Sequence, residues 1–275
     1  MFVLKTQTPV EAVGYPVKTF DNLPELELGL STSFNFLTVA QFGPRKNLQN
    51  TIKWFIEEFR NEDVGLVVKS NIAKNCLMDR NKLMNDLTNF IRAQGDKKCK
   101  VYLLHGDMTD EEIHALYKHP QIDAFLALPH GEGFGLPIFE AAYSGLPVVA
   151  TGWSGQLDFL TDEQGTEHFY NVSFDLQPVQ QNVVWENVII KESMWAYARE
   201  QSAKEKMRLC YEVLRKEHVE TRIARLNEAK AYAEELHKRF TPEGQYEKFV
   251  EIFNGESEKF DVQDWLNELE ATETE

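Results

Sequence analysis

The chain has few cysteines and no long apolar run. Its 275 residues include three cysteines, Cys76, Cys99 and Cys210. An odd number of widely spaced cysteines without a C-x-x-C pair argues against a disulfide framework and against a structural zinc site. No apolar stretch approaches the ~18 residues that span a bilayer, and residues 1–10 lack the long apolar stretch of a secretory signal. These absences predict no transmembrane segment and a reduced, cytoplasmic compartment.

Basic residues are also scarce, and the acidic excess is concentrated near the C-terminus. The chain carries 29 Lys+Arg against 44 Asp+Glu, a net charge of −15. Residues 241–275 account for −9 of this charge and residues 1–240 for −6. Such a surface repels the phosphate backbone of nucleic acids and anionic lipid headgroups. We therefore predict no nucleic-acid binding, and we interpret residues 254–275 as an acidic, solvated tail.

Apolar segments alternate with helix-like segments along most of the chain. Between them, Asn47–Arg60 has apolar residues at helical spacing, and Thr109 with Glu112 forms a capping box. Near-continuous apolar strands separated by helices predict a doubly wound, Rossmann-like α/β fold with a parallel sheet. One βα unit takes ~30 residues, so a second complete lobe cannot fit. The predicted strands are residues 36–42, 64–69, 101–105, 124–128, 147–151 and 168–174.

The predicted organisation has four consecutive parts. Residues 1–34 form a linker segment, residues 35–185 the Rossmann-like lobe, residues 186–253 a helical extension and residues 254–275 the tail. The extension is expected to be helical because residues 179–241 contain neither Gly nor Pro, and apolar positions recur at helical spacing from 219 to 240. A short acidic amphipathic piece follows, with Val262, Trp265, Leu266 and Leu269.

The most informative stretch is residues 128–155, LPHGEGFGLPIFEAAYSGLPVVATGWSG. It follows the fourth predicted strand, and ligands of open α/β sheets collect at the carboxyl ends of strands. Its glycines let the backbone approach a ligand closely. Pro137 and Gly145 suit the start and the end of a short helix. The N-terminus of that helix points backbone N–H groups at the loop and creates an anion site.

Two carboxylates, Glu132 and Glu140, accompany this anion site. Their negative charge disfavours a ligand that is only a phosphate. Carboxylates do, however, accept strong hydrogen bonds from hydroxyl groups. A ligand with both groups, such as a sugar nucleotide, satisfies both requirements. Alternatively, the turn is structural, since Gly-rich turns into helices are common and the helix dipole favours Glu near its N-terminus. Spacing alone leaves the two interpretations open.

The string EGFGLPIFEAAYSGLPVVAT resembles the Glu–seven residues–Glu signature of retaining group 1 (family four) glycosyltransferases of the GT-B fold. The likeness extends to VAQFGPRKNLQNTI, LLHGDMTDEEIHALY, SMWAYA and PVEAVGYPVKTF. It implies that the chain is the C-terminal, nucleotide-sugar-binding lobe of such an enzyme. The implied donor substrate is a UDP-, GDP- or ADP-sugar, and neither a cofactor nor a metal is implied.

The resemblance also implies roles for the residues of the Gly-rich loop. Glu132 contacts the donor sugar and is assigned as catalytic, and Glu140 binds the ribose hydroxyls. The backbone amides that face the sugar and the diphosphate are those of Gly133, Phe134, Gly135 and Leu136.

Two cations are expected to neutralise the diphosphate and to act in catalysis. Lys46 matches the lysine of the family, whereas the position of its arginine reads Gln41, so Arg45 is expected to supply the missing charge. Met108 and Asp110 match positions near the nucleotide base. His130 is a candidate donor contact, or else a loop histidine satisfied by the backbone.

The predicted function is glycosyl transfer with retention from a nucleotide diphosphate sugar to an acceptor hydroxyl. Because the chain lacks the first lobe of a GT-B enzyme, we expect donor binding but little transfer without a partner, which could be a separately encoded N-terminal lobe. The acceptor is not identified. The alternatives are a non-catalytic nucleotide-sugar-binding or assembly module and, third, a GT-B epimerase.

Other candidate residues favour structural roles. No nucleophile elbow is present, and the turn at Trp153 is expected to border the same pocket. Trp195 and Tyr197 are interpreted as core residues of the helical extension. A metal site is disfavoured because no HExxH or paired spacing is present. The residues considered for it were His105, His114, His119, Asp107 and Glu111.

Overall fold

The computed structural model describes residues 11–186 and 188–254, which divide into two compact units. The larger unit comprises residues 19–238 and contains the main sheet. The smaller unit combines residues 11–18 with residues 239–254 and includes α8 (Pro242–Asn254). Residues 255–275, which hold nearly all of the predicted tail and the whole amphipathic piece, lie outside the described residues.

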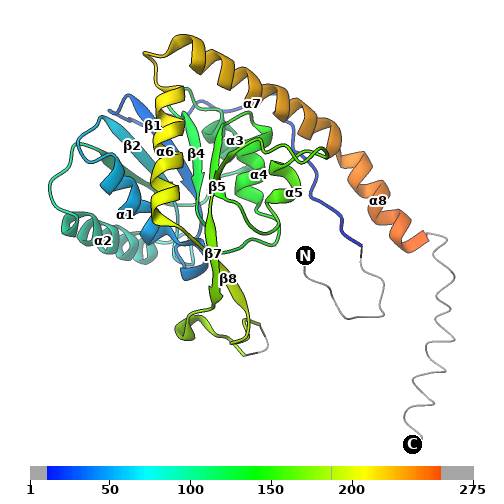
Figure 1. Ribbon diagram of the computed structural model, residues 1–275, viewed down its shortest axis with the longest axis horizontal. Helices are drawn as coiled ribbons and strands as arrows, with labels where there is room; N and C mark the ends of the chain where they lie inside the picture. The colour runs from blue at the N-terminus through cyan, green and yellow to red at the C-terminus, as the bar shows by residue number, and fades with distance from the viewer. Residues whose placement is uncertain (1–10, 187, 255–275) are drawn as a thin grey trace, which may run out of the picture. The chain divides into compact units, whose positions relative to one another are not determined.

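The larger unit is built on one six-stranded parallel sheet (Figure 1). Its strand order, β3-β2-β1-β4-β5-β6, is that of a doubly wound Rossmann-like sheet, which confirms the predicted fold class. All six predicted strands are present, with shifts of a few residues at their ends. The strands are β1 (Phe34–Val39), β2 (Val64–Lys69), β3 (Lys100–Leu104), β4 (Ala124–Ala127), β5 (Val148–Thr151) and β6 (Tyr170–Val172).

Helices cover both faces of this sheet (Figure 1). α1 packs with α6 on one face, and α3, α4 and α5 pack in sequence on the other. The capping box at the start of α3 is confirmed, because Thr109 and Glu112 exchange side-chain hydrogen bonds. None of the helices in the described ranges is long and apolar enough to cross a membrane. The helices of this unit are α1 (Leu48–Glu58), α2 (Leu77–Ala93), α3 (Asp110–Tyr117), α4 (Leu136–Tyr143), α5 (Leu157–Leu160), α6 (Glu200–Leu214) and α7 (Val219–Arg239, whose last residue belongs to the smaller unit).

Aromatic residues fill the core between β1, α1 and α6. The rings of Phe36 and Phe59 are 5.7 Å apart, and Tyr211 of α6 meets Phe59 edge-on at 5.5 Å. Arg208 of α6 lies over the Phe59 ring at 4.6 Å and donates a 2.6 Å hydrogen bond to Glu58. The apolar stripe predicted for residues 47–60 therefore packs α1 against the sheet and against the neighbouring α6.

The helical prediction is wrong for residues 186–198, the first part of the predicted extension. Residues 174–198 form an antiparallel hairpin, β7 (Phe174–Pro178) and β8 (Met194–Ala198). Large and small side chains alternate in MWAYA, and a strand places alternate residues on one face. Trp195 and Tyr197 therefore lie on the same face of β8, where both rings contact His130. The helical prediction is confirmed for α6 and α7, which follow the hairpin.

Candidate functional site

The candidate site lies where the carboxyl ends of β1 and β4 adjoin. β1 pairs with β4 in the centre of the sheet, and the chain builds the sheet outward from them in opposite directions. This reversal of strand order is the point at which open α/β sheets bind ligands. The loop after β1 carries Arg45 and Lys46, and the loop after β4 carries Glu132.

The structure brings the three predicted catalytic residues together. Arg45 Nη1 lies 3.0 Å from Glu132 Oε2, and Lys46 Nζ lies 2.5 Å from Glu132 Oε1. The side chain of Glu132 is 9% exposed and that of Lys46 18%. Arg45 also donates to the carbonyl oxygen of Gly131, 2.6 Å away. Two cations thus share one nearly buried carboxylate, which we call the Glu132 cluster.

A short 3-10 turn, η1 (Pro44–Lys46), sets the direction of both cations. Asn47 ends it in the left-handed region, with a φ of 55° that Asn tolerates better than most residues. The side-chain amide of Asn47 donates to the carbonyl oxygen of Leu128, and the His130 N–H donates to that of Arg45. These bonds join the loop after β1 to the loop after β4, and they hold the cluster in place.

The loop after β5 secures the backbone of Glu132. Ser154 Oγ donates to the carbonyl oxygen of Glu132 at 2.5 Å, and the Gly155 N–H reaches the same oxygen at 3.2 Å. An ideal Cβ at position 155 would lie 1.9 Å from the Gly133 carbonyl oxygen. Only glycine permits this approach. The turn at residues 153–155 therefore borders the site, as predicted.

The Gly-rich loop leads directly into α4. Gly135 precedes the helix with a φ of 95°, a conformation that side chains disfavour. The ring of Phe134 packs against Phe139 and Phe159, so the role predicted for Phe134 depends on its backbone amide. Leu136, the first residue of α4, is 40% exposed. The predicted roles of these amides stay predictions.

Glu140 projects from α4 toward α3. It accepts a 3.0 Å hydrogen bond from the hydroxyl of Tyr117. Burial, together with the adjacent carboxylate, raises the pKa of Tyr117 well above its usual value, so the hydroxyl keeps its proton and donates it. Tyr117 was not among the predicted site residues, because no motif in its segment distinguishes it from a core aromatic residue.

The remaining predicted residues occupy distinct positions. Gln41 donates to the carbonyl oxygen of Ile72 at 2.7 Å, so it fixes the loop after β2 rather than supplying charge. Met108 is half-buried just before α3, and Asp110 is exposed at its first position. Their predicted proximity to a base stays a prediction.

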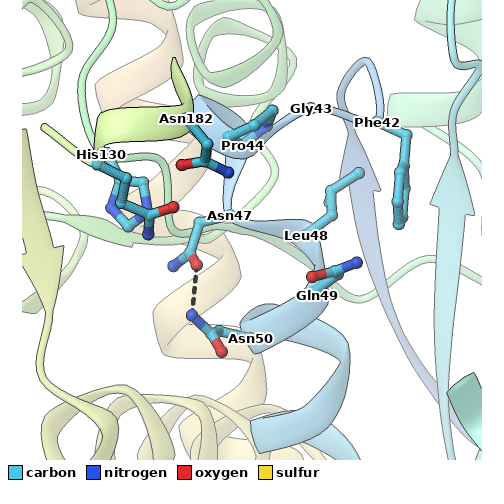
Figure 2. A pocket seen from close by; sticks show the side chains of 10 residues that line it. Phe42, Gly43, Pro44, Asn47, Leu48, Gln49, Asn50, His130 and Asn182 are labelled. Carbon is cyan, nitrogen blue, oxygen red and sulfur yellow. Dashed lines mark hydrogen bonds between the residues drawn. The ribbon is translucent and has the colours of Figure 1, made fainter. Parts of the chain in front are cut away.

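His130 is held by the hairpin. Its Nδ1 lies 2.9 Å from the carbonyl oxygen of Ala196, and its ring stacks on Trp195 at 5.4 Å. Burial lowers its pKa, which favours the neutral ring. Among the alternatives for His130, these contacts favour the loop histidine satisfied by the backbone. Its ring also borders a pocket of about 270 Å³ (Figure 2).

The three histidines that were candidates for a metal site each contact another protein group. His105 lies 2.8 Å from Asp79, His114 contacts Tyr143, and His119 contacts the carbonyl oxygen of Leu26. In the described ranges, no group of three or more His, Cys, Asp or Glu side chains is placed to hold a metal ion.

Comparison with known proteins gives concordant matches. Two curated relatives, each the serotype-specific mannosyltransferase WbdA of Escherichia coli, are 28% identical over 141 residues. This alignment covers 51% of the chain and 15–16% of each relative, so the chain spans about a sixth of the length of these proteins.

Solved structures match over a larger part of the chain. A glycosyltransferase from Rickettsia africae matches with a TM-score of 0.57 at 13% identity. The alignment covers 81% of this chain and 48% of the Rickettsia chain. Anabaena Alr3699/HepE, in complex with UDP and glucose, has a TM-score of 0.56 at 16% identity, with coverages of 82% and 50%. At these identities the likeness concerns the fold, which is that of one GT-B lobe.

The family itself is shown by sequence. Residues 27–170, more than half of the chain, match the family model described as "Glycosyl transferases group 1". The match contains the Glu132 cluster, the whole Gly-rich loop and Glu140. The chain therefore belongs to the group 1 glycosyltransferases.

Proposed function

We propose that this chain binds a nucleotide diphosphate sugar at the Glu132 cluster and takes part in transfer of the sugar, with retention, to an acceptor hydroxyl. The observation that carries the proposal is the convergence of Arg45 and Lys46 on Glu132 at the point where the strand order reverses. Family membership supports glycosyl transfer over the non-catalytic module.

The cations of the Glu132 cluster can stabilise a leaving group that becomes more negatively charged during the reaction. As the glycosidic bond breaks, negative charge builds up on the diphosphate, and fixed cations stabilise such charge most effectively where water is largely excluded. Lys46 is mostly buried. The N-terminus of α4 lies at the end of the loop that carries Glu132. A diphosphate carries more charge than one carboxylate and would compete with Glu132 for both cations. The carboxylate of Glu132 would then accept hydrogen bonds from the sugar hydroxyls.

Glu140 is proposed to bind the ribose hydroxyls of the donor. A carboxylate that keeps one oxygen on Tyr117 retains lone pairs for hydroxyl groups. The donor sugar is proposed to be a hexose, supported by the mannosyltransferase name of the E. coli relatives and by the UDP and glucose of the Anabaena protein. The matched region covers about half of the length of each solved structure, so the proposal concerns the donor side of the reaction. Cytoplasmic localisation stays a prediction.

Calorimetric titration tests this proposal. We expect one of UDP-glucose, GDP-mannose and ADP-glucose to bind, and Glu140→Ala to weaken binding about tenfold, since a hydrogen bond to a charged group contributes about 1.5 kcal/mol or more. The matched control is Glu163→Ala, which removes an exposed carboxylate outside the site. Binding of none of the three donors would contradict the proposal, and equal affinities for the two variants would contradict the role of Glu140.

A further inference from the structure

The pocket bordered by His130 adjoins the Glu132 cluster. It has a volume of about 270 Å³, close to the lower limit of ~300 Å³ for small-molecule sites. In Figure 2, His130 and Asn182 lie at one end of this pocket and Phe42 at the other, with Asn47 and Leu48 between them. Asn182 belongs to the segment between β7 and β8, so the hairpin forms one wall. We call this cavity the hairpin pocket.

Carboxamides dominate the polar lining of the hairpin pocket. None of the described residues in its wall is Lys, Arg, Asp or Glu, and burial favours the neutral form of its histidine. A carboxamide both donates and accepts hydrogen bonds, as a sugar hydroxyl does, whereas a phosphate or carboxylate ligand would meet no cation here. The carboxamides of the wall are those of Asn47, Gln49, Asn50, Gln180 and Asn182.

Two of these amides are available to a ligand. The amide of Asn47 is used for Leu128 and Asn50. Gln49 and Asn182 are exposed, and their side chains make no hydrogen bond within the described part of the chain. Phe42 and Leu48 add apolar surface, so the pocket combines an apolar side with a few polar groups, as small-molecule sites do.

The hairpin pocket and the Glu132 cluster are formed by the same two loops. Lys46 and Glu132 line a smaller cavity of about 20 Å³. Asn47, which follows Lys46, and His130, two residues before Glu132, line the hairpin pocket. The same two loops thus present charged groups to one cavity and uncharged groups to the other. We propose that the hairpin pocket binds one uncharged sugar ring of the acceptor, beside the site proposed for the donor diphosphate. The acceptor assignment rests on the proposed function.

The test uses the full chain and neutral sugars. Maltotriose, α-1,2-mannotriose and chitotriose are each titrated into the wild-type chain and into the double variant Gln49→Ala/Asn182→Ala. The control is Gln181→Ala, which removes an exposed carboxamide next to Asn182 that does not line the pocket. We expect at least one trisaccharide to bind and the double variant to weaken it about tenfold, because two hydrogen bonds are lost. The control is expected to stay within twofold of the wild type.

Several outcomes separate this inference from the proposed function. If no trisaccharide binds, or if the double variant binds as the wild type does, the hairpin pocket is not a sugar site. If a trisaccharide displaces a bound nucleotide sugar, the acceptor assignment is wrong. If the chain binds a trisaccharide through Gln49 and Asn182 but binds no nucleotide sugar, the sugar site stands and the proposed donor function fails. Melting temperatures of all variants check that each is folded.

Discussion

Replacing Lys46 by alanine is expected to weaken nucleotide-sugar binding about a hundredfold. Lys46 is the more buried of the two cations that meet at Glu132, since its side chain is 18% exposed and that of Arg45 is 43% exposed. Charge-assisted hydrogen bonds to phosphate contribute roughly 1.5–3 kcal/mol each, and a lysine amine can donate to more than one oxygen. Loss of about 2.8 kcal/mol corresponds to a hundredfold change in Kd. Calorimetry with the donor that binds the wild-type chain measures the effect.

Lys53→Ala is the matched control for Lys46→Ala. Lys53 lies in α1, is 43% exposed and pairs only loosely with Glu57 at 3.8 Å. Its removal should change donor affinity less than twofold, because an exposed ion pair contributes little. The fold should survive Lys46→Ala, since Arg45 still pairs with Glu132. Equal effects of the two substitutions would show that Lys46 does not bind the diphosphate.

Replacing Gly155 by alanine is expected to lower the free energy of unfolding by about 3 kcal/mol. The new methyl group would lie 1.9 Å from the carbonyl oxygen of Gly133, which is backbone and cannot rotate away. Overpacking of this kind typically costs about 1–3 kcal/mol. The melting temperature should fall by roughly 6–10 °C, as measured by calorimetry or circular dichroism. The displaced loop carries Glu132, so donor affinity should fall as well.

Gly133→Ala provides the control on the same loop. An ideal Cβ at position 133 meets no atom within 4 Å, and the residue needs no left-handed backbone. The free energy of unfolding should therefore change by about 0.5 kcal/mol or less. A Gly155→Ala variant as stable as Gly133→Ala would mean that the loops after β4 and β5 are not packed as the structure shows.

The sheet could be predicted because most of its strands are buried on both faces. Segments such as VGLVVK at residues 64–69 are almost wholly apolar, and such runs separated by amphipathic helices fit few folds other than a parallel sheet. The capping box of Thr109 could be read because it depends on two residues three positions apart. In both cases the decisive interactions are local in sequence or follow from burial alone.

The hairpin could not be predicted, because its signal is weak and its partner is distant. The strand β8 is only five residues long, and the absence of Gly and Pro before it favoured a helix. Its position depends on His130, 66 residues earlier, whose ring receives Trp195 and Tyr197. The resemblance to known glycosyltransferases assigned Lys46 and Glu132 to one site, but their direct pairing across 86 residues follows only from the register of β1 against β4.

The site roles themselves stay predictions until a ligand is located. The most direct measurement is a crystal structure of the chain with whichever nucleotide sugar binds in calorimetry. The predicted result is a diphosphate within hydrogen-bond distance of Lys46 Nζ, with the sugar at the carboxylate of Glu132. A diphosphate bound elsewhere, with the ion pairs of Glu132 unchanged, would contradict the account.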